Sequence, residues 1–312
     1  MKIGRLGEFG LIEVIRRSVP AKSAGVVAGI GDDAAVLRSN GRRSSLLLTT
    51  DTLVEGIHFS FDHATYRELG WKLAAVNISD IAAMGGVPGY ALVTLGLKKD
   101  TSVEDVEDIY RGIKAISKRY GLIVVGGDIV SSPKAFFATM ALTGSCDHPV
   151  MRSGARPGDK LMAVGRFGAS SAGMRALKKF GRKALKISGV KDLAKAHLMP
   201  RPMIDEGLEL SKVASSMIDN SDGLARSLIE LSRAGGVGFD IYPDRIPLAR
   251  GASINDALNG GEDYNLIFTV KRGARIPKGS IEIGRTTKVR RILTIDRAGR
   301  SKQLKETGFE HF

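Results

Sequence analysis

Apolar residues recur along this chain with two alternating periods, one typical of strands and the other typical of helices. Short apolar runs predict strands at residues 45–50, 90–97, 122–125, 136–143, 160–164, 216–218, 237–242, 264–270 and 281–283. Longer segments with a helical period lie at residues 8–17, 66–84, 103–120, 170–180, 204–214 and 224–233. This alternation predicts an α/β or α+β fold, in which helices cover the faces of sheets.

The chain divides where turn-forming residues are concentrated. Residues 145–159 contain two prolines and two glycines between two predicted strands. A chain of 312 residues is long enough to bury two separate cores. We therefore predict an N-terminal domain at residues 1–145 and a C-terminal domain at residues 146–312.

Composition is that of a globular protein, with 43% hydrophobic and 26% charged residues. The first residues mix charge with glycine before any apolar block, and no apolar run approaches the roughly 20 residues of a membrane span. These features predict a cytoplasmic protein with no membrane partner. The single cysteine, Cys146, excludes an intramolecular disulfide and a cysteine-based metal site.

The formal net charge of +14 fits a nucleic-acid-binding module, an enzyme with anionic substrates or a thermophile's basic surface. Lysine and arginine are scattered along the chain without interleaved aromatics, and aromatic residues make up only 6%. A platform for stacking single-stranded bases therefore has little to be built from. Composition alone leaves the basic nucleic-acid-binding module open as an alternative.

Aspartates carry the most informative pattern. Asp51, Asp128 and Asp219 follow strand-like apolar runs, Asp33 lies in a glycine-rich turn, and Asp80 lies on a predicted helix. Any one of them is explained equally well as a cap or a turn former. A group of them carries a repulsive cost that bound cations offset, and oxygen donors without cysteine suit Mg²⁺.

A metal site of this kind suggests phosphoryl transfer, in which the protein positions groups and neutralises charge. The dipeptide Gly-Lys is absent, so the chain has no Walker A loop, and the His-Arg-Asp and Asp-Phe-Gly motifs of protein kinases are also absent. Phosphate is then expected to contact metal ions, the amides of Gly126 and Gly127, and isolated cations, of which Arg152 is the best placed.

Sequence blocks spanning nearly the whole chain resemble those of the thiamine-monophosphate kinase family, within the aminoimidazole ribonucleotide synthetase-like superfamily. They lie, in the family's order, at residues 31–35 (GDDAA), 49–59, 75–85, 126–128 (GGD), 152–159, 218–224, 260–264 (GGEDY) and 308–312 (GFEHF). The last two blocks favour the thiamine branch. Another ATP-using member of the superfamily, similar to aminoimidazole ribonucleotide synthetase, is the alternative.

The resemblance implies a two-domain fold whose N-terminal sheet pairs with its counterpart in a homodimer, with the active site between the domains. It also implies Mg²⁺-assisted, direct in-line transfer of the γ-phosphoryl group of ATP to thiamine monophosphate, which gives thiamine diphosphate. ATP and thiamine monophosphate would then be the small-molecule substrates, with no nucleic-acid partner.

By the same resemblance, eight residues would bind Mg²⁺: Asp33, Thr49, Thr50, Asp51, Asp80, Asp128, Asp219 and Asp222. Asp128 and Asp222 would also be catalytic. Gly127, Arg152, Ser221 and Tyr110 would contact ATP, and His58, Glu262 and Phe309 would contact the thiamine moiety.

Three of these residues also have plainer explanations. His58 could be a packed or capping histidine, Tyr110 a half-buried residue of an amphipathic helix, and Phe309 an anchor of the chain end. The chain departs from the family pattern at Asn220, where an apolar residue is more common, and at Phe309, which replaces a Trp or Tyr.

Overall fold

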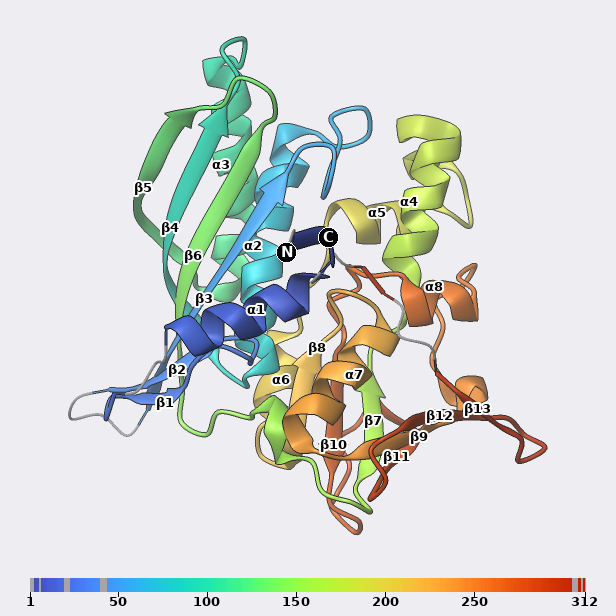
Figure 1. Cartoon of the computed structure of the whole chain (residues 1–312). Coiled ribbons are helices and arrows are strands. Elements are labelled where there is room, and N and C mark those ends of the chain that lie inside the picture. The colour runs from blue at the N-terminus through green and yellow to red at the C-terminus, as the bar shows by residue number, and fades with distance from the viewer. Residues whose placement is uncertain are drawn as a thin grey trace.

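The computed structural model describes residues 3–5, 7–19, 23–39, 44–304, 308, 309 and 311. Two sheets, one in each half of the chain, stand side by side with helices around them (Figure 1). The helices are α1 (Gly7–Ser18), α2 (Tyr66–Ala83), α3 (Val103–Tyr120), α4 (Ala169–Phe180), α5 (Lys191–Leu198), α6 (Ile204–Leu210), α7 (Leu224–Gly235) and α8 (Ile254–Asn259). The mixed α/β class expected from the sequence is confirmed.

The first sheet has the strand order β1-β2-β3-β6-β4-β5. Its strands are β1 (Val26–Ala28), β2 (Ala35–Arg38), β3 (Ser45–Val54), β4 (Val87–Leu97), β5 (Ile123–Ser131) and β6 (Phe137–Cys146). Neighbouring strands are antiparallel except β4 and β5, which run parallel and are joined by α3. A parallel pair needs such a crossover connection, and α3 supplies it.

Helices α2 and α3 cover one face of this sheet, and their apolar side chains complete its core. Helix α2 is apolar almost all round because it also contacts α6 and β8 of the other half. The two helices touch closely at Gly70 and Gly112. A Cβ atom on Gly112 would lie 2.0 Å from the carbonyl oxygen of Arg67, so only glycine fits there.

The opposite face of the first sheet exposes apolar side chains. Leu92 is 51% exposed, and Tyr90, Ile123 and Val125 are also exposed. A sheet with one face against helices normally alternates apolar and polar residues, with the polar residues facing water. This face therefore has the composition of a surface that another protein covers.

The second sheet has the strand order β13-β12-β9-β11-β7-β10-β8. Its strands are β7 (Lys160–Val164), β8 (Ala214–Asp219), β9 (Gly238–Ile241), β10 (Leu266–Val270), β11 (Ser280–Thr287), β12 (Ile292–Ile295) and β13 (Ser301–Gln303). Two apolar clusters bury side chains of its central strands, which explains why β10 is buried at every position. Residues 147–159 connect the two sheets, so the proposed domain boundary falls at the end of β6.

Several predicted elements differ from the observed ones. Strand β3 continues to Val54 and β5 continues to Ser131, so Asp51 and Asp128 lie within strands instead of following them. The pairing of β5 with β4 continues through Gly127 because backbone hydrogen bonds need no side chain. The predicted helix at 204–214 ends at Leu210. Helices α5 and α8 and strands β1, β2, β12 and β13 were not predicted.

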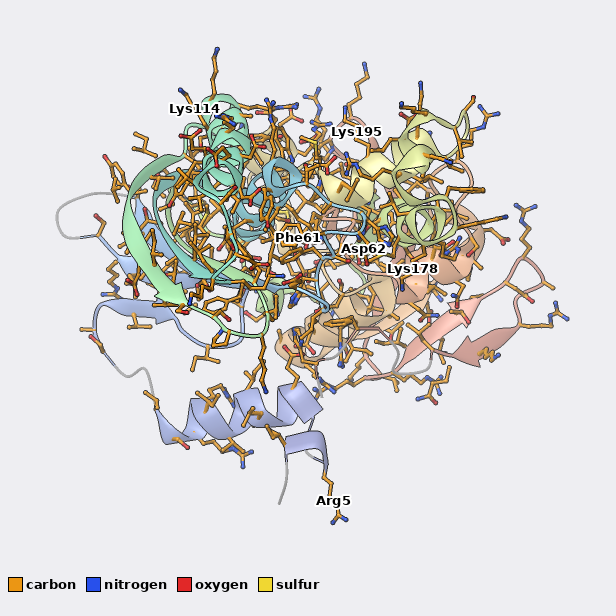
Figure 2. The ribbon with its side chains drawn as sticks, turned by 90° about the horizontal axis from the view of Figure 1, so that it is seen from above. Arg5, Phe61, Asp62, Lys114, Lys178 and Lys195 are labelled. Atoms are coloured by element: carbon orange, nitrogen blue, oxygen red, sulfur yellow. The ribbon has the colours of Figure 1, made fainter. Side chains whose placement is uncertain are left out.

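The basic residues are spread over the surface. Figure 2 shows Lys114 of α3 and Lys195 of α5 pointing outward from separate helices, and Arg5 near the chain start. No helix in the described ranges is long and apolar enough to cross a membrane.

Candidate active site

Three aspartates from distant parts of the chain meet between the two sheets. One carboxylate oxygen of each of Asp33, Asp80 and Asp219 lies within 4.8 Å of the others. Asp33 precedes β2, Asp80 lies in the last turn of α2, and Asp219 ends β8. Both halves of the chain therefore contribute to one acidic cluster, which we define as these three residues.

Neighbouring polar groups orient the acidic cluster. The Thr49 hydroxyl donates a hydrogen bond to Asp80, and the Ser79 hydroxyl donates to Asp219 at 2.5 Å. The second oxygen of Asp33, Oδ2, is buried and accepts no hydrogen bond within the described part of the chain. A buried carboxylate oxygen without a donor is costly, which is expected where a cation completes the site.

Burial and mutual repulsion raise the pKa values of these acids. Burial and then the charge of Asp33 raise the pKa of Asp219 to about 8. Burial, followed by the charges of Asp51 and Asp219, raises the pKa of Asp80 well above its ordinary value. Burial raises the pKa of Asp51 to about 6. A divalent cation would remove this repulsion and hold all of these groups ionised.

The acidic cluster fits a hard cation. Its donors are carboxylate oxygens, the Thr49 hydroxyl contacts Asp80, and neither cysteine nor histidine belongs to it. The Thr50 hydroxyl donates instead to the Met140 carbonyl at 3.1 Å. Such donors suit Mg²⁺, which keeps several waters or phosphate oxygens among its ligands.

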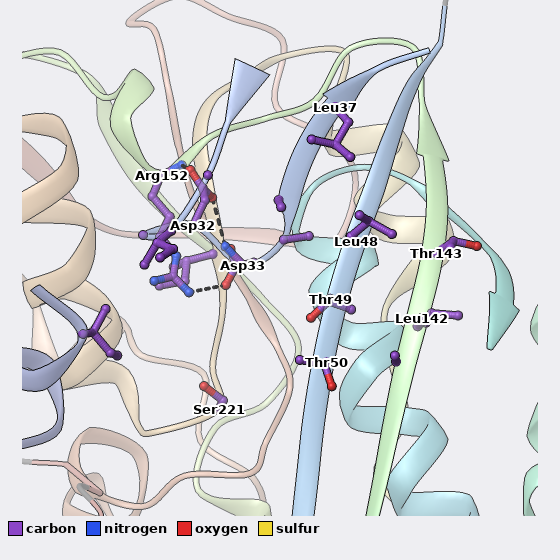
Figure 3. A pocket seen from close by; sticks show the side chains of 18 of the residues that line it. Asp32, Asp33, Leu37, Leu48, Thr49, Thr50, Leu142, Thr143, Arg152 and Ser221 are labelled. Atoms are coloured by element: carbon purple, nitrogen blue, oxygen red, sulfur yellow. Dashed lines mark hydrogen bonds and ion pairs between the residues drawn. The ribbon is translucent and has the colours of Figure 1, made fainter. Parts of the chain in front are cut away.

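Arg152 brings positive charge to the rim of this cluster. Its guanidinium donates to Asp33 at 2.5 Å, and its backbone N–H donates to Asp32 at 3.1 Å. Figure 3 shows Asp32, Asp33 and Arg152 on one side of a cavity whose opposite wall includes Leu48, Leu142 and Thr143 of the first sheet.

This first cavity has a volume of about 1160 Å³ and extends from the acids over the exposed face of the first sheet. Glu8 and Ile12 of α1, which crosses the front of the molecule in Figure 1, also line it. It is large enough for a nucleotide-sized ligand.

A second cavity of about 590 Å³ lies on the other side of the acids. Asp51, Asp80 and Asp222 line it together with His58, Glu262 and Phe309, so the sequence-predicted thiamine residues share one space. His58, Phe309 and His311 form an aromatic cluster, with ring centroids 4.9 to 6.3 Å apart. The Phe309 backbone N–H donates to the carbonyl of Asp222 at 3.3 Å, which joins the chain end to the acids.

The GGEDY block is held in an unusual backbone conformation. Glu262 and Tyr264 have positive φ angles of 65° and 52°, which are uncommon for residues other than glycine. A Cβ atom on Gly261 would lie 2.2 Å from the Ser221 carbonyl oxygen, so only glycine allows this approach. Strain of this kind is typical of functional sites. Here it directs the Glu262 side chain into the second cavity.

Three of the predicted site residues lie away from the acidic cluster. Gly127 and Asp128 lie on β5 at the edge of the first sheet, and both are exposed. Within the described residues, the Asp128 side chain accepts a hydrogen bond only from the backbone of its neighbour Ile129. Tyr110 lies on α3 and is half-exposed. These three residues stand outside the acidic cluster, and their roles stay predictions.

Sequence reasoning missed four residues of the site: Asp32, Lys72, His197 and His311. Lys72 was detectable as the one charge within the apolar stretch 69–76 of α2, since buried lysines are rare unless paired. His197 carried no signal, because α5 itself was not predicted.

The fold and the site define a class of two-domain proteins. Residues 31–146 match the family model described as AIR synthase related protein, N-terminal domain. Residues 156–278 match the model described as AIR synthase related protein, C-terminal domain. The first match covers strands β2 to β6 of the first sheet, and the second covers strands β7 to β10 of the second sheet.

Relatives of similar length narrow this class. The chain is 34% identical to thiamine-monophosphate kinase of Aquifex aeolicus over the full length of both chains. It is 37% identical to that of Corynebacterium glutamicum, over 95% of this chain and 91% of the relative. The solved structure described as AaThiL complexed with AMPPCP and TMP is 35% identical, with a TM-score of 0.90 over 100% of this chain and 99% of that one. The chain belongs to the thiamine-monophosphate kinase family.

Proposed function

We propose that the protein transfers the γ-phosphoryl group of ATP to the phosphate of thiamine monophosphate and so forms thiamine diphosphate and ADP. One observation carries this proposal: the two cavities share Ser221 and Asp222 and meet at the acidic cluster. A nucleotide in the larger cavity and a thiamine phosphate in the smaller one would bring their phosphates together there. The relative in complex with AMPPCP, an ATP analogue, and TMP supports the same pairing.

Mg²⁺ is the cation that this donor set fits best, and when bound it supplies charge neutralisation for the phosphate oxygens. Asp33, Asp80 and Asp219 would hold it, with Thr49, Thr50, Asp51 and Asp222 around them. Arg152 and Ser221, which line the first cavity, would contact the nucleotide's phosphates.

Direct in-line transfer is the simplest chemistry for this arrangement. The bond between the γ-phosphorus and its bridging oxygen breaks as an oxygen of the acceptor phosphate bonds to the same phosphorus. That acceptor oxygen is already anionic, so no general base is required. Catalysis then consists of positioning and charge stabilisation, for which Asp222 lies at the junction of the two cavities.

A homodimer is the second part of this proposal. The apolar outer face of the first sheet also forms a wall of the first cavity, through Tyr90, Leu92 and Val125. A second copy placed on this face would cover the apolar residues and narrow the cavity. Gly127, Asp128 and Tyr110 would then contribute to ATP or metal binding across the interface. We also assign the protein to the cytoplasm, in keeping with biosynthesis of a soluble cofactor.

Turnover with defined substrates tests the proposal. Purified protein, ATP, Mg²⁺ and thiamine monophosphate are incubated, and the products are separated by chromatography. Thiamine diphosphate and ADP are expected in equal amounts, and a control without Mg²⁺ should give neither. Free phosphate without thiamine diphosphate would contradict the acceptor, and a phosphorylated protein intermediate would contradict direct transfer. Aminoimidazole ribonucleotide formation in a parallel assay would favour the alternative superfamily activity.

The high net positive charge makes DNA binding the alternative to test. If the protein were a nucleic-acid-binding module, it would bind DNA with an affinity that falls steeply as salt rises. We expect no such binding, because the cations are dispersed over separate helices.

A further inference from the structure

Lys72 is a buried cation that the proposed transfer does not use. Its residue is 3% exposed, and it lies on α2 between apolar neighbours. The ammonium group is 2.5 Å from Oε1 of Glu262 and donates to the backbone carbonyl of His58 at 3.0 Å. Burying an ammonium is costly unless it is paired and hydrogen-bonded, so both contacts are needed to keep it there.

His197 of α5 is the second partner of Glu262. Its Nδ1 lies 3.2 Å from Oε2 of Glu262, and the ring is almost fully buried. Burial and then the charge of Lys72 lower the pKa of His197. The same Nδ1 also lies 2.9 Å from the Ser170 hydroxyl, so this nitrogen faces both Ser170 and Glu262. Lys72 therefore lies against Oε1 of Glu262, and His197 lies against Oε2.

Glu262 keeps part of its surface for a ligand. Its side chain is 25% exposed and lines the second cavity beside His58 and Phe309. Each carboxylate oxygen can accept two hydrogen bonds, so contacts with Lys72 and His197 leave acceptor positions free. Burial alone would raise the pKa of Glu262, but Lys72 and His197 lower it to about 2, which agrees with an ionised group.

Lys72 joins parts of the molecule that are distant in sequence. Helix α2 belongs to the first half of the chain, and Glu262 belongs to the second, in the segment before β10. The His58 carbonyl lies just after β3. One ammonium group therefore links the Glu262 carboxylate to the backbone of His58, whose ring accepts a hydrogen bond from the Val54 backbone N–H at 3.0 Å.

We propose that Lys72, assisted by His197, is a positioning residue for the acceptor. It fixes the Glu262 carboxylate relative to His58, so the second cavity selects a heteroaromatic ring that carries positive charge or an amino donor. This inference rests on the proposed function, because it takes the second cavity as the place of thiamine monophosphate.

Kinetics of Lys72→Met test the inference. The Met side chain keeps much of the lysine's length and loses its charge. The KM for thiamine monophosphate should rise at least about tenfold, which corresponds to about 1.4 kcal/mol of binding. The KM for ATP and kcat should each change less than about threefold, which is within about 0.7 kcal/mol. Lys72→Arg should recover part of the loss.

A double-mutant cycle with Glu262→Gln separates positioning from a general structural role. If Lys72 acts through Glu262, adding Lys72→Met to Glu262→Gln should change the KM for thiamine monophosphate less than about twofold. The full effect of Lys72→Met in that background, or a parallel rise in the KM for ATP, would overturn the inference.

Lys98→Met is the matched control. Lys98 forms a more exposed ion pair with Glu55, at 3.1 Å, and neither residue lines the two cavities. The kinetic constants of Lys98→Met should equal those of the unaltered protein. If Lys72→Met does not fold, His197→Asn removes the other contact without leaving a buried charge unpaired, and it should raise the same KM about threefold. An unchanged KM in His197→Asn would then overturn the inference.

Equilibrium binding of thiamine monophosphate, measured by calorimetry, distinguishes failure of the proposed phosphoryl transfer from failure of the proposed role of Lys72. Binding without turnover would reject the proposed function, while the comparison of Lys72→Met with the unaltered protein would still test the inference. No binding by the unaltered protein would overturn both.

Discussion

At the scale of single residues, Asp219 shows how a site can be costly to the protein that contains it. The residue is 2% exposed, and its carboxylate faces those of Asp33 and Asp80. Carboxylates packed in this way destabilise the fold until a cation binds. The position of Asp219 is therefore explained by metal binding and not by stability. The Ser79 hydroxyl, which donates to this carboxylate, offsets only part of that cost.

Replacement of Asp219 by Asn should therefore separate activity from stability. We expect kcat/KM for ATP to fall at least about 100-fold, because a lost metal ligand costs several kcal/mol and each 1.4 kcal/mol is a factor of ten. The metal-free variant should melt at the same temperature as the unaltered protein or higher, since Asn is buried without having to bind a proton. Steady-state assays and calorimetry measure the two effects.

Asp244→Asn is the control for this substitution. Asp244 is an exposed acid paired with Arg297, far along the chain from the acidic cluster. Its loss should leave activity unchanged and alter stability by less than about 0.5 kcal/mol. Equal losses of activity in both variants would contradict a specific role for Asp219.

At the scale of elements, the contact between α2 and α3 depends on Gly70 and Gly112. A Cβ on Gly70 would lie 2.0 Å from the Ile109 carbonyl oxygen, as close as the one on Gly112 would lie to that of Arg67. The two helices can approach this closely only without side chains at these positions. Because α2 carries Asp80 at its other end, this contact also supports the site.

Gly112→Ala should destabilise the protein although alanine is the better helix former. Helix propensity favours alanine by about 1 kcal/mol, but the new methyl group would meet backbone atoms that cannot rotate away. We expect a net loss of about 2 kcal/mol in the free energy of unfolding. Urea denaturation measures it, with Lys114→Ala on the exposed side of α3 as the control. A stabilised Gly112→Ala variant would show that the helices can separate without cost.

The apolar outer face of the first sheet is the surface through which we expect two copies to associate. If a second copy covers its outer face, Leu92→Glu should place charges in that interface and yield a monomer, because unpaired buried charges cost several kcal/mol. Light scattering after gel filtration measures the mass. Lys114→Glu, on the helical side of the same domain, should leave the assembly unchanged. A monomeric unaltered protein would contradict the dimer.

At the scale of the whole molecule, protons and metal compete for the acids. The pKa of Asp219 is about 8 in the folded chain, against an ordinary value of 3.8. Between these values the folded state holds a proton that the unfolded state has released. The metal-free protein should therefore lose stability as pH rises from about 4 to about 8, and a cation should restore it.

Thermal unfolding at two pH values measures this competition. The rise in melting temperature on adding Mg²⁺ should be larger at about pH 8 than at about pH 6, by at least about 2 °C, because protons no longer compete with the metal at the higher pH. Asp219→Asn should remove most of the difference. An Mg²⁺ effect independent of pH would show that these acids do not bind the ion.

The sequence by itself determined the class of fold, the helices with a strong apolar period and the family blocks. Helix α3 runs over the predicted residues 103–120, because its apolar stripe and its cap at Ser102 are local features. Short elements such as α5 and β12 escaped prediction, since their stability comes from packing on a sheet that the local sequence does not describe.

Only the tertiary structure decided which aspartates share a site. Asp33, Asp80 and Asp219 are separated by long stretches of chain, and their approach depends on how α2 packs between the two sheets. The same packing pairs Lys72 with Glu262, while Asp128 is held on the outer strand β5. The chemistry of each side chain is written in the sequence, but distances between them follow from long-range packing, which no local pattern encodes.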